Sequence, residues 1–156
     1  MNTVFAIAVL LAISPTCVRP GTSPLPTATA TLHWGTVDLP RGSYCWNFGE
    51  GGECADSAGP DQLLKTGYLK PYRTAGGFDA TVHFHATSGR RSLTVSLLLT
   101  PGEISRGHVS QPTQQTFRIP EVASSSAGVY VYAVTGTWAE GDVSFLLALD
   151  LIPGVA

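Results

Sequence analysis

The sequence predicts an all-β domain, an antiparallel β-sandwich of about seven strands with one local disulfide. Glycine (17) and proline (11) are frequent among the 156 residues and separate short runs rich in Val, Leu, Phe and Tyr. That mixture is typical of strands joined by turns. Only 13% of residues are charged and the formal net charge is -2, so the basic surplus of a nucleic-acid-binding protein is missing. We therefore expect no nucleic-acid partner.

The chain begins with an apolar run, Val4–Ile13, which has the length of a signal-peptide core and is too short to span a bilayer. No Lys or Arg precedes it, although signal peptides usually carry basic residues there. The alternative to a signal peptide is a buried N-terminal strand. Ser14-Pro15 ends the run and a polar segment follows, which favours export. We predict residues 1–19 to be an export leader and the protein to be extracytoplasmic, either secreted or anchored to the outer face of the cell membrane.

Cys17 stands where bacterial lipoproteins carry their lipidated cysteine, and it is the candidate lipidation site. The usual motif has Leu three residues earlier and a small residue directly before the cysteine, whereas here Ser14 and Thr16 hold those places. A lipid anchor, cleavage nearby and an unprocessed segment all stay open. The odd number of cysteines favours the anchor, because it leaves Cys45 and Cys54 as an even pair. Any membrane contact is expected only through this anchor.

Residues 20–31 alternate Pro, Thr, Ser and Ala without an apolar period. Such a segment buries too little surface to offset its ordering entropy, so it is predicted to be a flexible tether. The folded domain is then expected at residues 32–156, with shorter strands at Thr31–Leu39, Tyr68–Tyr72 and Gln115–Ile119. Pro60–Lys65 is predicted to form one helical turn that stops at Gly67.

Two hairpins carry the fold prediction. Asp79–Thr87 and Ser92–Leu99 both alternate apolar and polar residues, and a four-residue loop would bring their apolar faces together. That register pairs Ala86 with Leu93, Phe84 with Val95 and Val82 with Leu97. It also places His83 and His85 beside Thr94 and Ser96.

The second predicted hairpin joins Val129–Trp138 to Val143–Leu151 through the turn Ala139–Asp142. One face is aromatic and aliphatic, and the other is mixed and expected to be half exposed. The register pairs Trp138 with Val143, Val134 with Leu147, Tyr132 with Leu149 and Tyr130 with Leu151.

Cys45 and Cys54 enclose eight residues, three of them glycine. In an oxidising compartment the default interpretation is a structural disulfide, which would contribute roughly 2.5–3 kcal/mol through loop-closure entropy. There is no CxxC redox motif, and a zinc site would need two more ligands at suitable spacing.

Ser126–Tyr132 (SAGVYVY) resembles the approach to the late strand of immunoglobulin-like domains. Tyr130 matches the corner tyrosine of that pattern, and Tyr132 stands where the usual cysteine would be. The resemblance implies an Ig-like topology without the inter-sheet disulfide.

The cysteine pair lies within Gly42-Ser43-Tyr44-Cys45-Trp46 and Cys54-Ala55-Asp56, followed by Pro60. This pattern resembles a group of uncharacterised bacterial secreted proteins and lipoproteins. Members tend to end in a Gly-x-Tyr-x-Tyr strand, a Trp and a Gly-Asp hairpin, which Gly128, Tyr130, Tyr132, Trp138, Gly141 and Asp142 match. The resemblance covers most of the folded domain and implies a secreted or lipid-anchored β-sandwich.

His83 and His85, two apart on a strand, project from one face and are the candidate metal ligands, with His33 or His108 as a third. The alternative is two exposed histidines with no ligand. Acidic residues gather around the disulfide in sequence, at Glu50, Glu53, Asp56 and Asp61. Their spacing matches no EF-hand loop, and no Gly-x-Ser-x-Gly nucleophile motif occurs. We therefore predict no catalytic residues and no cofactor.

Asp56 is expected to cap backbone N–H groups after Cys54. With Trp46 it is the candidate binding surface. Trp34, Trp46 and Trp138 could line a sugar- or peptide-binding surface, although Trp46 and Trp138 are better interpreted as core. The function predicted from the sequence is a non-catalytic binding or structural module of the bacterial cell envelope, with an unknown protein or envelope component as partner. The alternatives are a metal-binding protein or metal-dependent enzyme and a small Ig-like proteinase inhibitor.

Overall fold

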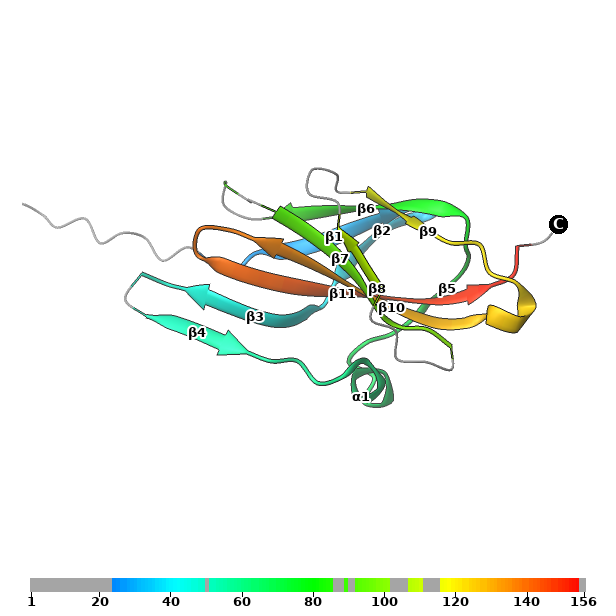
Figure 1. Cartoon of the computed structure of the whole chain (residues 1–156), viewed down its shortest axis with the longest axis horizontal. Coiled ribbons are helices and arrows are strands. Elements are labelled where there is room, and N and C mark those ends of the chain that lie inside the picture. The colour runs from blue at the N-terminus through cyan, green and yellow to red at the C-terminus, as the bar shows by residue number, and fades with distance from the viewer. Residues whose placement is uncertain are drawn as a thin grey trace, which may run out of the picture.

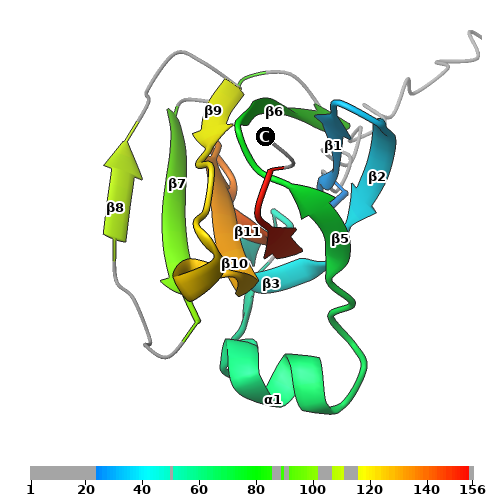
Figure 2. The same cartoon turned by 90° about the vertical axis from the view of Figure 1, so that its right-hand side faces the viewer.

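A computed structural model describes residues 24–49, 51–85, 89, 92–101, 107–110 and 116–154. The predicted leader (1–19) with Cys17, and residues 20–23 of the predicted tether, lie outside these ranges. The described part is a sandwich of two β-sheets (Figures 1 and 2). The predicted all-β sandwich is therefore confirmed.

The four-stranded sheet contains, in spatial order, β2 (Gly35–Leu39), β1 (Thr27–Leu32), β6 (Phe78–His85) and β9 (Thr116–Ile119). The seven-stranded sheet contains β4 (Gly52–Ala55), β3 (Arg41–Asn47), β11 (Gly141–Ile152), β10 (Gly128–Thr137), β7 (Ser92–Leu99) and β8 (Gly107–Ser110), and β5 (Tyr72–Ala75) also pairs with β11. The β5–β11 pairing is parallel and all other pairings are antiparallel. One helix, α1 (Pro60–Lys65), and one 3₁₀ turn, η1 (Ser124–Ser126), complete the described elements.

The seven strands from β5 to β11 are arranged as in an immunoglobulin-like fold. β6 lies beside β9 in one sheet, and β7, β10 and β11 are neighbours in the other, as strands B–E and C–F–G are in that fold. The Tyr130 hydroxyl donates a 2.8 Å hydrogen bond to the Ser126 carbonyl, which is the tyrosine-corner geometry. These seven strands match the predicted number, and β1–β4 raise the total in the described residues to eleven.

The predicted hairpin between residues 79–87 and 92–99 is wrong, although the predicted faces are right. Ala80, Val82, Leu93 and Val95 are all buried, but β6 pairs with β1 and β9, and β7 pairs with β10 and β8. The two strands lie in opposite sheets with their apolar faces toward one core. The alternation fixes which face is buried, and it does not decide whether two strands hydrogen-bond or stack across the sandwich.

The C-terminal hairpin forms, but its predicted register is wrong by two residues. Tyr132 pairs with Leu147, Val134 with Phe145 and Thr137 with Asp142. A shift of two residues keeps every side chain on its face, so the face pattern could not exclude it. Trp138 leaves the strand yet stays buried, because its ring lies against Gly136, where a Cβ would be 2.3 Å from it.

The folded domain begins earlier than predicted. Thr27–Leu32 forms β1, paired with β2 and β6, and Pro26 is fully buried. The boundary at residue 32 is therefore too late, and residues 27–31 are not tether. The predicted strand at 68–72 instead begins at Tyr72, whereas the helical turn Pro60–Lys65 and the strand near 115–119 are confirmed.

Hydrophobic side chains are buried on both sides of the seven-stranded sheet. The main core fills the sandwich, and a second cluster on the outer side joins Leu146 and Ala148 of β11 to Leu63 of α1 and to Leu69. Figure 2 shows α1 outside the sandwich, below this sheet. The mixed face of β10–β11, predicted to be half exposed, is half exposed at its two ends, around Thr135, Thr137 and Ser144 and around Val129 and Asp150. Between these ends it is buried, at Val131, Ala133, Leu146 and Ala148.

Gly141, at the start of β11, tests the packing of the two hairpins. Its φ is +151°, and a Cβ there would lie 1.9 Å from the Cys45 carbonyl oxygen. We expect Gly141→Ala to lower the free energy of unfolding by roughly 2–4 kcal/mol, because the backbone must move. Gly154→Ala is the control, since nothing lies within 4 Å of that site. Equal urea-unfolding free energies for the two variants would contradict this packing.

Candidate functional site

The disulfide predicted from the sequence is confirmed. Cys45 and Cys54 lie directly opposite each other on β3 and β4, with Cα atoms 4.0 Å apart, and both are exposed. Because side chains alternate along a strand, Trp46 points to the other face. It is only 2% exposed and packs edge-on against Trp138. Trp46 is therefore a core residue: the core interpretation is confirmed, and its alternative place on a binding surface is wrong.

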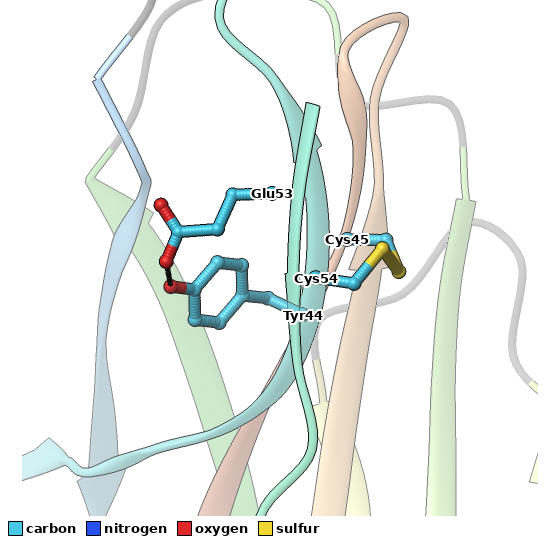
Figure 3. The surroundings of a disulfide bond; sticks show 4 residues. All are labelled: Tyr44, Cys45, Glu53 and Cys54. Carbon is cyan, nitrogen blue, oxygen red and sulfur yellow. Dashed lines mark hydrogen bonds between the residues drawn. A yellow bond between two sulfur atoms is a disulfide. The ribbon is translucent and has the colours of Figure 1, made fainter. Parts of the chain in front are cut away.

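The face of this hairpin opposite the disulfide carries a polar pair. The Tyr44 hydroxyl donates a 2.5 Å hydrogen bond to the Glu53 carboxylate, and Figure 3 shows the pair and the disulfide on opposite faces. This hydrogen bond raises the pKa of Tyr44 above its usual value, with burial adding to the effect. The turn after β4 is fixed by Ser43, whose hydroxyl accepts the Ser57 N–H at 3.0 Å. Asp56 is exposed, and the capping role predicted for it belongs to Ser43.

A hollow of about 500 Å³ lies beside the disulfide, between the β3–β4 hairpin and the β10–β11 turn. Its acidic lining residues are Glu53, Glu140 and Asp142. Asp56 and Asp61, which the sequence grouped with Glu53, do not line it, and Glu50 lies outside the described residues. The β10–β11 turn supplies acids that sequence proximity to the cysteines could not indicate.

The histidines do not converge. His83 and His85 lie on the outer face of the four-stranded sheet. They lie beside Thr29 of β1, and the predicted position beside β7 is wrong. Thr29 Oγ1 and His85 Nε2 are 3.0 Å apart. His33 stacks on Phe78, at the far end of β6, about 23 Å from His85 for seven residues of strand. The side chain of His108 lies outside the described part, and within that part no group of three His, Cys, Asp or Glu side chains is placed to hold a metal ion.

Three large hydrophobic side chains are exposed in the described part of the chain, and they lie together. Trp34 is 44% exposed, Tyr68 55% and Tyr72 37%. The rings of Trp34 and Tyr72 are 5.4 Å apart. Tyr68 is held by its hydroxyl, which donates a 3.0 Å hydrogen bond to the Arg41 carbonyl. Large aromatic groups that gather in solvent are typical of binding surfaces.

Tyr68 and Tyr72 line a second hollow of about 290 Å³, which we call the seam hollow. It lies where β2, at the edge of one sheet, meets β11 of the other. The floor is formed by Leu146 and Ala148 of β11. One wall is the chain from β2 to β3, and the other is the connection from α1 to β5, so that the lining includes Asp38, Leu39, Pro40, Tyr68, Lys70 and Tyr72.

The seam hollow carries one charge of each sign. Asp38 belongs to β2 and Lys70 to the α1–β5 connection, and both side chains are exposed. Neither forms an ion pair with another described residue. The hollow thus combines an apolar floor, aromatic walls and two unpaired opposite charges. Of its aromatic neighbours the sequence pointed only to Trp34; nothing in the spacing of Tyr68 and Tyr72 marked them as site residues.

Comparisons with protein-family models, with curated proteins and with solved structures find no match to this chain. Within the described ranges, no helix is long and apolar enough to cross a membrane.

Tyr44 and Glu53 give a prediction on pH. Because its pKa is raised, Tyr44 stabilises the fold below its unfolded pKa of about 10, and this contribution is lost as the pH rises through the folded pKa. We expect Glu53→Gln to lower the pKa of Tyr44, measured by NMR or tyrosinate absorbance. Glu140→Gln is the control, since Glu140 lies in the neighbouring hollow. A Tyr44 titration that is the same in both variants would contradict the assigned hydrogen bond.

Proposed function

We propose that this protein is a non-catalytic extracytoplasmic binding module of the bacterial cell envelope. Its proposed binding site is the seam hollow, lined by Tyr68 and Tyr72, together with the adjoining Trp34. The observation that carries the proposal is that two exposed aromatic residues, Tyr68 and Tyr72, line one hollow and that a third, Trp34, contacts Tyr72. Trp34 is distant in sequence from Tyr68 and Tyr72, and in solution each of the three leaves a large part of its ring facing water. A partner that covers them would gain the corresponding hydrophobic free energy.

Three features support an extracytoplasmic place for this module. The apolar run Val4–Ile13 has the length of a signal-peptide core. Cys17 directly after it is the candidate for lipid attachment. The exposed Cys45–Cys54 disulfide is of a kind that persists in oxidising compartments and is rare in the cytosol.

Aromatic residues at the centre of a binding surface usually dominate its energetics, because they are rigid and bury a large area. Tyr72 is the central candidate here, since it contacts Trp34 on one side and lines the hollow on the other. Tyr68, fixed through Arg41, forms a wall that needs little ordering when a ligand binds.

The test is retention of the mature protein on envelope fractions of the bacterium that produces it. We expect the double variant Trp34→Ala, Tyr72→Ala to bind at least about tenfold more weakly, since loss of a central aromatic residue costs roughly 2 kcal/mol or more. Both side chains are exposed, so the melting temperature should change little.

The matched control is His83→Ala, His85→Ala, which removes two exposed rings from the outer face of the other sheet. It should be retained like the wild type. Equal retention of the wild type and the Trp34, Tyr72 variant would overturn the proposed site. Loss confined to the histidine variant would instead favour the metal-binding alternative.

A further inference from the structure

We propose that the partner of the seam hollow is an extended peptide segment of another protein, which adds as a new strand to the free edge of β2 and places a large apolar side chain in the hollow. This inference rests on the proposed function, because it specifies the ligand of the same site. It combines three observations: an unpaired strand edge, a small apolar hollow beside it, and two unpaired charges on its walls.

Among the described strands, β2 pairs with β1 alone and is an edge strand. A two-residue turn joins the two strands, so the pair that closes it, Leu32 and Gly35, is hydrogen-bonded. From there along the strands, hydrogen-bonded pairs alternate with pairs that are not hydrogen-bonded. Val37 therefore directs its N–H and C=O toward β1, whereas Thr36 and Asp38 direct theirs outward. No backbone hydrogen bond from that outer edge is formed within the described residues. A five-residue edge, about 17 Å long, is thus open to a peptide.

The hollow suits a side chain better than a whole small molecule. Its volume of about 290 Å³ lies just below the roughly 300–1,000 Å³ of small-molecule pockets. Leu146 and Ala148 give it an apolar floor. In strand addition the backbone hydrogen bonds supply affinity and such hollows select side chains. A polysaccharide would find polar side chains for its hydroxyl groups on the walls, at Asp38 and Lys70, but none on the floor of Leu146 and Ala148.

The charges specify the residues that flank this anchor. Asp38 lies on the β2 side of the hollow and Lys70 on the opposite wall, and neither has an ionic partner among the described residues. A peptide with a basic residue toward Asp38 and an acidic group toward Lys70 would complement both. The structure therefore favours a segment in which a large apolar residue stands between opposite charges.

The test selects peptides from a random heptapeptide phage library on the wild-type protein and measures dissociation constants with the selected peptides, made synthetically. The decisive variant is Thr36→Pro, because proline removes an outward N–H that β1 does not use, and proline is tolerated at that side of an edge strand. We expect the dissociation constant to rise at least about tenfold. Thr36→Val, which keeps the N–H, is the matched control and should change it less than about twofold.

A second variant keeps the proposal falsifiable if Thr36→Pro does not fold. Asp38→Lys reverses one charge at the hollow, and peptides selected on it should carry an acidic residue where those selected on the wild type carry a basic one. Unchanged charge preference would contradict the assigned orientation and overturn the proposal.

The outcomes separate this inference from the proposed function. Peptide binding that Tyr72→Ala weakens and Thr36→Pro does not would overturn strand addition and leave the binding site in place. If the wild type instead binds a polysaccharide on a glycan array and Tyr72→Ala weakens that binding, the polysaccharide is the ligand and the peptide is overturned. If selection on the wild type enriches no peptide more strongly than selection on Tyr72→Ala, the peptide ligand is overturned. Envelope retention that is insensitive to Trp34 and Tyr72 would overturn both.

Discussion

The fold depends on the need to bury both faces of β11. This twelve-residue strand directs Phe145, Leu147 and Leu149 into the sandwich and Leu146 and Ala148 to the opposite side, and all five are at most 3% exposed. A two-layer sandwich covers only the first face. Burial of a Leu side chain contributes about 1.5–3 kcal/mol, so an uncovered second face would be costly. Leu63 of α1 and Leu69 after it provide the cover.

The same constraint produces the candidate site. One edge of β11 pairs with β3 as far as Phe145 and with β5 from Leu149 onward. Between these partners, the hydrogen bond that this edge forms with the described residues is that from the Leu146 N–H to the Pro40 carbonyl, 2.9 Å long. The chain that runs from α1 to β5 covers this gap incompletely, and the seam hollow is what remains. Tyr68 and Tyr72 line it because they are part of that covering chain.

The sequence was informative about faces and uninformative about partners. Alternation placed Val82 and Val95 correctly in the core, because a half-buried strand must show it wherever the strand lies. It could not reveal that β6 and β7 belong to different sheets, nor exclude a two-residue shift between β10 and β11. The disulfide was predictable because its two cysteines are close in sequence and the loop between them is rich in glycine.

The site was less predictable for a related reason. Trp34 meets Tyr72 because β5 pairs in parallel with the last strand and thereby approaches the β1–β2 turn. Parallel pairing joins segments far apart in the chain and leaves no local signal. Trp46 was a candidate for a binding surface because aromatic residues supply contact area, although core was the favoured interpretation. The strand period of two points its side chain away from the exposed cysteines and into the core.

The most direct measurement of the central claim, that β2 presents a free edge to a partner, is amide hydrogen exchange of β2 read by NMR. In the free protein the N–H of Val37 should be protected, since it points to β1, and those of Thr36 and Asp38 should exchange rapidly. Addition of a selected peptide should slow exchange at Thr36 and Asp38. Protection of both N–H groups in the free protein, or no slowing when a peptide binds, would contradict the account.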